Sequence, residues 1–323
     1  MTHPTDVSAE PTPQPADAGP PRQPEETDVP PEPEETDVPP EPEGTDVPPE
    51  PGGARRAGRN LLAATAVGLA LGALILVTIY WYPRGFVAVL VVAFVIAVAE
   101  LVTALMSSAQ IAPPRLPLLG GTVAMVLCAY SGGLAGLAVA YAATVLVIVF
   151  WRLPRGPRDT VRDTSAGIWA ATYVPFLGGF AALMFAQPQG AGRIVVFVAT
   201  TVCSDVGGYA LGVLTGRHLL ARRISPKKTW EGFAGSLLAG LAGGCVLSGW
   251  LLGTRWWQGL LLGAAVVVVA TFGDLAESSV KRDLGIKDMG RLLPGHGGIM
   301  DRLDSLLPVA PVAYVLLTVF VGG

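Results

Sequence analysis

The residues best suited to chemistry lie in one polar stretch near the C-terminus, Asp274 to Ser305. It reads DLAESSVKRDLGIKDMGRLLPGHGGIMDRLDS and lies between two apolar runs. Placing polar and charged groups against a bilayer costs free energy, so such groups usually take part in a function. Acids, bases, a histidine and turn-forming glycines occur together here, which is the mixture that binding of a metal ion and of phosphate groups requires.

Carboxylates stand at both ends of this stretch. Asp274 lies at the end of one apolar run, and Asp301 and Asp304 precede the last one. The segment between Pro294 and Gly298 is rich in glycine and predicts a tight reversal, which would bring Asp274 and Asp301 together. Two converging carboxylates near several bases suit Mg²⁺ bound to a nucleotide triphosphate.

A plainer interpretation of the same residues is a solvated helix end held by ion pairs. Glu277 and Lys281 are four residues apart, the spacing of a helical ion pair, and Ser278 and Arg282 border the same helix face as Asp274. The glycine reversal and the acids at both helix ends favour a functional site over this alternative.

A second basic segment, Arg217 to Glu231, reads RHLLARRISPKKTWE. A basic loop beside a membrane is often only an orientation signal or a contact to anionic lipid. Here Ser225, Lys227 and Lys228 come just before a predicted helix start that Thr229 can cap. Backbone N–H groups at a helix start, together with two lysines, predict a pocket for phosphate oxygens.

Asp205 lies inside an apolar run, followed by Gly207 and Gly208. An ionisable side chain at membrane depth should line a cavity or meet a cation. The alternative is a buried aspartate satisfied by hydroxyl or backbone groups. Glu100, in another apolar run, has no assigned role.

The elements that must position these residues are apolar runs. Of the 323 residues, 51% are apolar, and the mean hydropathy is +0.51. We expect an all-α, polytopic transmembrane helical bundle of about nine spans, since each run is long enough to cross the hydrocarbon layer. The expected spans are Leu61–Trp81, Phe86–Met106, Leu116–Tyr130, Leu134–Trp151, Ile168–Phe185, Ile194–Leu214, Phe233–Leu252, Trp257–Leu275 and Leu306–Val321. The tight break at Ser131–Gly133 also allows two neighbouring runs to form a re-entrant pair.

The positive-inside rule orients the bundle. With a cytoplasmic N-terminus and nine spans, eighteen bases fall on the cytoplasmic side and three, Arg84, Arg193 and Arg255, on the other. The polar stretch from Asp274 to Ser305 is therefore predicted on the cytoplasmic face of a bacterial-type inner membrane.

The N-terminal region has a different composition. Residues 1–53 hold fourteen acids and one base, and a nine-residue repeat, TDVPPEPEE and two variants, starts at Thr27, Thr36 and Thr45. Such a segment cannot form a core and predicts a disordered tail. We expect residues 1–58 to be this tail and residues 59–323 to form the membrane domain, with catalysis independent of the tail.

The pattern S-x-V-K-R-x4-K-D-x-G-x2-L-P-x-H-G-G-I-x-D-R-L-D over residues 278–304 resembles the signature of phosphatidate cytidylyltransferases, the CDP-diacylglycerol synthases. The segments SPKKTWEG from Ser225 and D-x-G-G-Y from Asp205 are similar to the same family. The resemblance covers the second half of the chain, and the first four spans share only hydropathy with the family. The acidic repeat is outside it.

The resemblance implies that CTP and phosphatidate are the substrates and that CDP-diacylglycerol and pyrophosphate are the products. It implies Asp274 and Asp301 as Mg²⁺ ligands, a second, monovalent cation, and a homodimer. No nucleic-acid partner is expected. From their chemistry, four bases would offset phosphate charge: Lys227, Lys228, Lys281 and Arg282. Four further residues would shape the pocket, Lys287, Asp288, His296 and Asp304, with Asp205 supporting it from within the membrane.

Other functions are open on the residues alone. Another membrane lipid kinase or nucleotidyltransferase would use similar groups, but the complete pattern from Lys287 to Asp304 argues against it. An ion-coupled transporter would explain Asp205, Glu100 and the many spans. It would be expected to repeat broken helices in both halves, whereas the charged groups here gather near one end of the chain.

Overall fold

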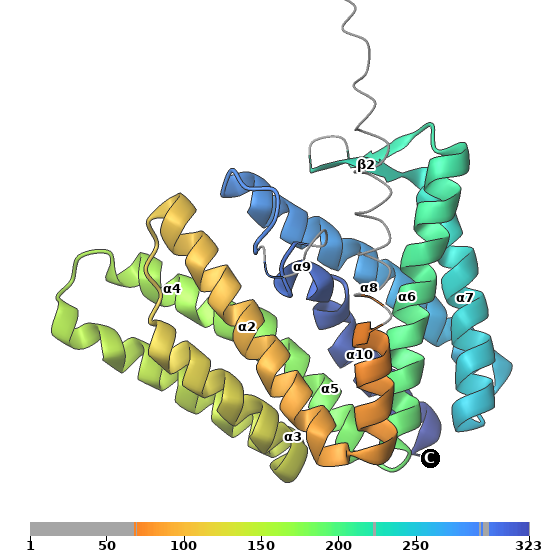
Figure 1. Cartoon of the computed structure of the whole chain (residues 1–323), viewed down its shortest axis with the longest axis horizontal. Coiled ribbons are helices and arrows are strands. Elements are labelled where there is room, and N and C mark those ends of the chain that lie inside the picture. The colour runs from red at the N-terminus through yellow and green to blue at the C-terminus, as the bar shows by residue number, and fades with distance from the viewer. Residues whose placement is uncertain (1–67, 69, 222–223, 291, 293–296, 323) are drawn as a thin grey trace, which may run out of the picture. The chain divides into compact units, whose positions relative to one another are not determined.

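The structure is a computed structural model that describes residues 68, 70–221, 224–290, 292 and 297–322 (Figure 1). The predicted tail, residues 1–58, lies outside these residues. Seven of the described helices are long and apolar enough to cross a membrane. They confirm the predicted all-α membrane fold.

The helices follow the apolar runs. In chain order they are a helix over Ala70–Trp81, α2 (Pro83–Ala109), α3 (Arg115–Arg152), a 3-10 turn (Leu153–Arg155), α4 (Thr160–Ala171), a π-helical segment (Thr172–Phe176), α5 (Leu177–Ala186), α6 (Gly190–Thr215), α7 (Trp230–Leu252), α8 (Trp256–Asp283), α9 (Met300–Leu303) and α10 (Leu306–Val321). The segments α4, π and α5 together form one span, and so do α9 and α10.

Two of the predicted runs, Leu116–Tyr130 and Leu134–Trp151, are joined in α3. Gly133 interrupts the helix with φ 62° and ψ −155°, a conformation that glycine adopts without a steric penalty. Gly121, before the break, packs against Thr144, after it, so the two halves fold back on each other. The described residues therefore hold seven candidate spans instead of the nine expected, with two of the predicted runs merged in α3 and with the shorter apolar helix Ala70–Trp81 in the described part of the first run.

Glycines bring α6, α7 and α8 into close contact. A Cβ atom on Gly235 of α7 would overlap the backbone of Gly207 in α6, and one on Gly263 of α8 would overlap Gly240 of α7. Association of helices inside a bilayer depends on such close packing, because lipid tails are as apolar as the side chains. The stacking fixes the position of Asp205 on α6 relative to the polar end of α8.

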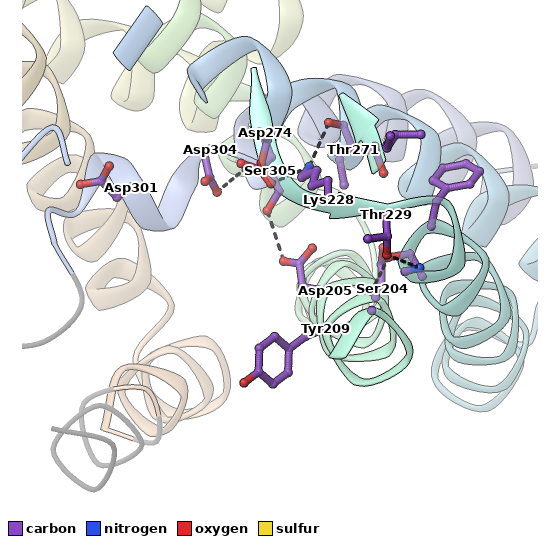
Figure 2. A pocket seen from close by; sticks show the side chains of 18 of the residues that line it. Ser204, Asp205, Tyr209, Lys228, Thr229, Thr271, Asp274, Asp301, Asp304 and Ser305 are labelled. Carbon is purple, nitrogen blue, oxygen red and sulfur yellow. Dashed lines mark hydrogen bonds and ion pairs between the residues drawn. The ribbon is translucent and has the colours of Figure 1, made fainter. Parts of the chain in front are cut away.

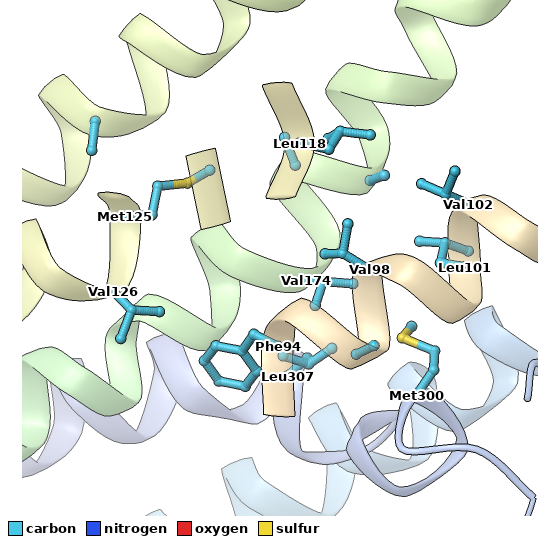
Figure 3. Close-up of a cluster of buried hydrophobic side chains, with 14 of the residues drawn as sticks. Phe94, Val98, Leu101, Val102, Leu118, Met125, Val126, Val174, Met300 and Leu307 are labelled. Carbon is cyan, nitrogen blue, oxygen red and sulfur yellow. The ribbon is translucent and has the colours of Figure 1, made fainter. Parts of the chain in front are cut away.

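A second packing cluster surrounds α2 (Figure 3). Phe94, Val98 and Leu101 of α2 are buried in the same cluster as residues of α3, the π segment, α9 and α10. Met300, which precedes Asp301, belongs to this cluster and is fully buried. The N-terminal helices, which the family resemblance covers only by hydropathy, therefore pack directly beneath the polar stretch.

A short hairpin between α6 and α7 was not predicted. Strands β1 (Leu219–Ala221) and β2 (Ser225–Thr229) pair antiparallel. The predicted helix start is present, because Thr229 caps α7 through a hydrogen bond from Gly232 N to its Oγ1 atom at 3.1 Å. Ser225 and Lys228 are thus presented by a strand that leads into the capped helix.

Candidate active site

A cavity of about 770 Å³ lies among α6, the hairpin, α7, α8 and the segment around α9 (Figure 2). Residues far apart in the sequence line it, from Ser204 to Ser305. Its charged lining consists of five acids and three bases, Asp205, Asp274, Asp288, Asp301, Asp304, Lys228, Lys281 and Arg302. The structure therefore brings the polar stretch, the hairpin and the aspartate of α6 into one cavity.

Lys228 connects the hairpin to α8. Its Nζ atom lies 2.5 Å from Asp274 Oδ2 and donates to the carbonyl oxygen of Thr271 at 3.3 Å. Ser278, one turn along α8, donates to Asp274 Oδ1 at 3.4 Å. A lysine is thus held at the carboxylate that the family resemblance assigns to the metal ion.

Lys281 connects α8 to the segment before α10. Its Nζ atom lies 3.2 Å from Glu277 Oε1 and 3.1 Å from Asp301 Oδ1. The helical ion pair of the plainer interpretation is therefore present, but Lys281 also reaches a carboxylate twenty residues away. Glu277 is 1% exposed, and its Oε2 atom has no hydrogen-bond partner in the described part of the chain.

Asp301 is held by backbone groups as well as by Lys281. Met289 N donates to Oδ1 at 3.1 Å and to Oδ2 at 3.0 Å, and Gly298 N donates to Oδ2 at 2.9 Å. Gly297 has φ 77°, so the turn before Asp301 uses the backbone freedom of a glycine. The carboxylate thus ties together both ends of the loop that precedes it.

Three other carboxylates affect one another electrostatically. The carboxylates of Asp304 and Asp205 are each close enough to Asp274 for their negative charges to repel, and they also repel each other. Ser305 donates to Asp205 Oδ2 at 3.4 Å, which joins α6 to the start of α10. Figure 2 shows Asp304 between Asp301 and Asp274, with Asp205 turned toward Ser305.

The composition of this cavity fits a divalent metal ion. Carboxylates are hard oxygen ligands, and a bound cation would offset the repulsion among them. Within the described residues, no three His, Cys, Asp or Glu side chains are grouped closely enough to hold one ion. One or two protein carboxylates completed by water and phosphate oxygens is the usual arrangement for Mg²⁺ in nucleotide-binding enzymes.

The remaining predicted site residues fall into three groups. Ser225 and Asp288 line the cavity, whereas Arg282 and Lys287 are exposed and are not among the described lining residues. His296 and the side chain of Lys227 lie outside the part of the chain that the structure describes. Their predicted roles stay predictions.

Sequence reasoning missed several lining residues, among them Ser204, Tyr209, Ser236, Thr271, Arg302 and Ser305. Ser236 donates to the carbonyl oxygen of Ser204 at 2.8 Å, a contact between α7 and α6 that depends on how the helices are rotated. For Tyr209 and Arg302 a signal was available, because both are fixed positions of the patterns that resemble the family.

Comparison with known proteins identifies one family. Residues 62–320 match the cytidylyltransferase family. A phosphatidate cytidylyltransferase of Mycobacterium leprae is 44% identical over 279 residues, covering 81% of this chain and 89% of the relative. One from Mycobacterium bovis is 42% identical over 276 residues, covering 81% and 90%. One from Brucella suis is 36% identical over 181 residues, covering 54% and 62%.

Proposed function

The chain belongs to the cytidylyltransferase family, and on that basis we propose that it transfers the cytidylyl group of CTP to phosphatidate. The products are CDP-diacylglycerol and pyrophosphate. The observation that carries this proposal is the cavity in which acids and lysines from α6, β2, α8 and α9 meet at the ends of apolar helices.

The reaction forms one bond and breaks another. An oxygen of the phosphatidate phosphate attacks the α-phosphorus of CTP, the bond from that phosphorus to the bridging oxygen breaks, and the electron pair leaves with pyrophosphate. The lipid phosphate is already ionised at neutral pH, so the step needs no general base. Positioning and charge compensation are then the main contributions of the protein.

Lys228 and Lys281 are the cations placed to compensate phosphate charge. Both line the cavity, and each contacts a carboxylate, Lys228 at Asp274 and Lys281 at Glu277 and Asp301. These contacts hold the ammonium groups in the cavity before substrate arrives. The lysines then need little reorganisation to meet the phosphates, which is how preorganised charges lower a barrier.

The family generally uses a divalent metal ion, and we propose that Mg²⁺ binds here with Asp274 and Asp301 as ligands. When bound, the ion would offset charge on the triphosphate and on the leaving group. Asp205 and Asp304 lie close enough to Asp274 to add to the negative field that attracts a cation. A second, monovalent cation in the same acidic cavity is part of the proposal.

The membrane arrangement follows from the same cavity. The acyl chains of phosphatidate stay in lipid while its head group enters among the polar side chains. We propose that the cavity opens to the cytoplasmic face of a bacterial inner membrane, because in that orientation eighteen of the twenty-one bases after residue 53 are cytoplasmic, as the positive-inside rule favours. A homodimer is proposed from the family resemblance.

The test uses the full chain, purified in detergent, with labelled CTP, phosphatidate and Mg²⁺. Asp274→Asn should lower formation of labelled lipid by at least about 100-fold, as expected for loss of a metal ligand. Asp283→Asn is the matched control, because Asp283 is exposed at the end of the same helix and does not line the cavity. It should keep the parent activity.

Asp301→Asn should lower activity as strongly, and it should also lower the melting temperature, because Asp301 accepts backbone hydrogen bonds. Equal product from the parent and from Asp274→Asn would refute the metal assignment. A parent without product under any nucleotide would refute the proposed reaction.

A further inference from the structure

Glu100 is a carboxylate of α2 to which neither the proposed reaction nor the family pattern gives a role. Its Oε2 atom accepts a hydrogen bond from Met300 N at 2.9 Å, and the backbone of Ile299 also hydrogen-bonds to the carboxylate. Met300 lies 200 residues further along the chain and directly precedes Asp301. Glu100 thus holds the backbone that leads into the candidate site.

Two glycines of the same loop make room for Glu100. A Cβ atom on Gly290 would overlap the Glu100 carboxylate, and so would one on Gly298. Neither glycine has a positive φ, so backbone conformation does not require glycine at these positions. Glycine is required there because the Glu100 carboxylate occupies the space that a side chain would need.

The loop that Glu100 holds is also the loop that Asp301 holds. Gly298 N and Met289 N donate to Asp301, and their neighbours Ile299, Met300 and Gly290 contact Glu100. Two like-charged carboxylates, close enough to repel each other, therefore accept hydrogen bonds from neighbouring peptide groups of one loop. The backbone N–H groups between them offset that repulsion.

The position of Glu100 is costly for a residue that only fills space. Its Oε1 atom is buried and has no hydrogen-bond partner among the described residues, and the loop residues Met289 and Met300 belong to the apolar cluster around α2. Burying a carboxylate oxygen without a partner is unfavourable. An apolar side chain of similar volume would fill the same space without that cost but could not accept the backbone hydrogen bonds.

We propose that Glu100 is a positioning residue for cytidylyl transfer: it fixes the turn at residues 297–300 and thereby sets Asp301, and through Asp301 the ammonium group of Lys281. The proposal rests on the proposed function. The proposal gives α2 a direct part in shaping the site. This helix belongs to the half of the chain that carries no recognised motif.

The first experiment compares Glu100→Ala with Glu100→Gln in the detergent assay with CTP, phosphatidate and Mg²⁺. Loss of the acceptor should lower kcat at least about tenfold in Glu100→Ala and should raise the Mg²⁺ concentration needed for half-maximal rate, because Asp301 loses its fixed position. The amide oxygen of glutamine still accepts from Met300, so Glu100→Gln should recover most of the rate.

Val87→Ala is the matched control for stability. Val87 is buried in the same helix, thirteen residues before Glu100, which is about 20 Å along an α-helix. It should lower the melting temperature but leave kcat and the Mg²⁺ requirement unchanged. If Glu100→Ala lost activity only in proportion to its loss of folded protein, as Val87→Ala does, the positioning role would be overturned.

A double-mutant comparison tests the contact itself. Gly290→Ala adds a methyl group where the Glu100 carboxylate lies, so it should displace Glu100 and lower kcat as Glu100→Ala does. Combining the two changes should cost no more than about a further twofold, because residues in contact are not additive. Fully multiplied losses would show that Gly290 and Glu100 act independently and would overturn the contact.

A measurement that does not depend on activity completes the test. Amide hydrogen exchange in peptides covering residues 284–302 should become faster in Glu100→Ala and remain unchanged in Val87→Ala. Unchanged exchange in Glu100→Ala would overturn the proposal. An inactive parent would overturn the proposed function and the catalytic part of this inference, and the exchange result would still decide whether Glu100 holds the loop.

Discussion

The two carboxylates assigned to the metal ion have different surroundings. Asp301 accepts hydrogen bonds from two backbone N–H groups and from Lys281, and each of its oxygens takes part. Asp274 is contacted by Lys228 and Ser278. Because side chains move more easily than a loop backbone, Asp274 can exchange its partners for a cation without disturbing the fold, whereas Asp301 also serves as an anchor.

Lys228 lines the cavity and contacts Asp274, so its substitution tests whether lysines compensate phosphate charge. Lys228→Ala should lower kcat/KM for CTP by about 100-fold, comparable to the loss of one preorganised donor at a reacting group. Arg158→Ala, an exposed base away from the cavity, should change it less than twofold. Steady-state kinetics with CTP varied at saturating phosphatidate measures both. A normal rate in Lys228→Ala would exclude a role for this ammonium group.

At the residue scale, the sequence predicted which charged residues would come together better than it predicted their contacts. Asp274, Asp301 and Lys281 were expected in one site and do line one cavity. The bond between Ser305 and Asp205 could not be predicted, because it depends on how α6 and the start of α10 are rotated toward each other. Arg282 is one position from Lys281, and this places it on an exposed face of the same helix.

The elements differ from the predicted runs mainly where polar residues continue a helix. The eighth run was expected to end at Leu275, but α8 continues to Asp283. Hydropathy marks only the apolar part of a helix, and the last two turns carry the charged residues of the site. The hairpin was missed for a related reason, since its strands are short and its sequence is dominated by bases.

The glycine contacts between α7 and α8 provide a stability prediction. A Cβ atom on Gly244 would lie 2.5 Å from the carbonyl oxygen of Gly259 and 2.9 Å from the Cα atom of Gly263. Gly244→Ala should therefore force the helices apart and cost about 1–3 kcal/mol of folding free energy. Thermal unfolding in detergent would show this as a lower melting temperature.

Gly120→Ala is the control for that measurement. Gly120 is exposed within α3, and a Cβ atom there meets no described atom within 4 Å. Replacing a helical glycine with alanine in open space should be neutral or stabilising by up to about 1 kcal/mol. Equal destabilisation by both changes would contradict the account of the helix contacts.

At the scale of the whole molecule, hydropathy predicted the all-α membrane fold, because each helix must satisfy its backbone hydrogen bonds internally when it crosses a bilayer. It could not predict which helices touch. The packing of α10 against both α5 and α8, which connects the two halves of the chain, depends on side-chain shape. The family match covers residues 62–320, and the expected domain start near residue 59 stays a prediction.

The orientation of the molecule is open to a direct test. Asp283 and Arg255 are exposed at opposite ends of α8. In a chain whose three cysteines are replaced by serine, an impermeant maleimide should label Asp283→Cys only from the cytoplasmic side and Arg255→Cys only from the other side. The reverse pattern would place the cavity outside the cell and contradict access to CTP.

The most direct test of the central claim follows the two ends of the triphosphate. The purified parent chain is given phosphatidate, Mg²⁺ and CTP that carries ³²P at either the α or the γ position. Cytidylyl transfer predicts labelled lipid from α-labelled CTP only, with the γ label recovered in pyrophosphate. Labelled lipid from γ-labelled CTP would identify a kinase and contradict the account.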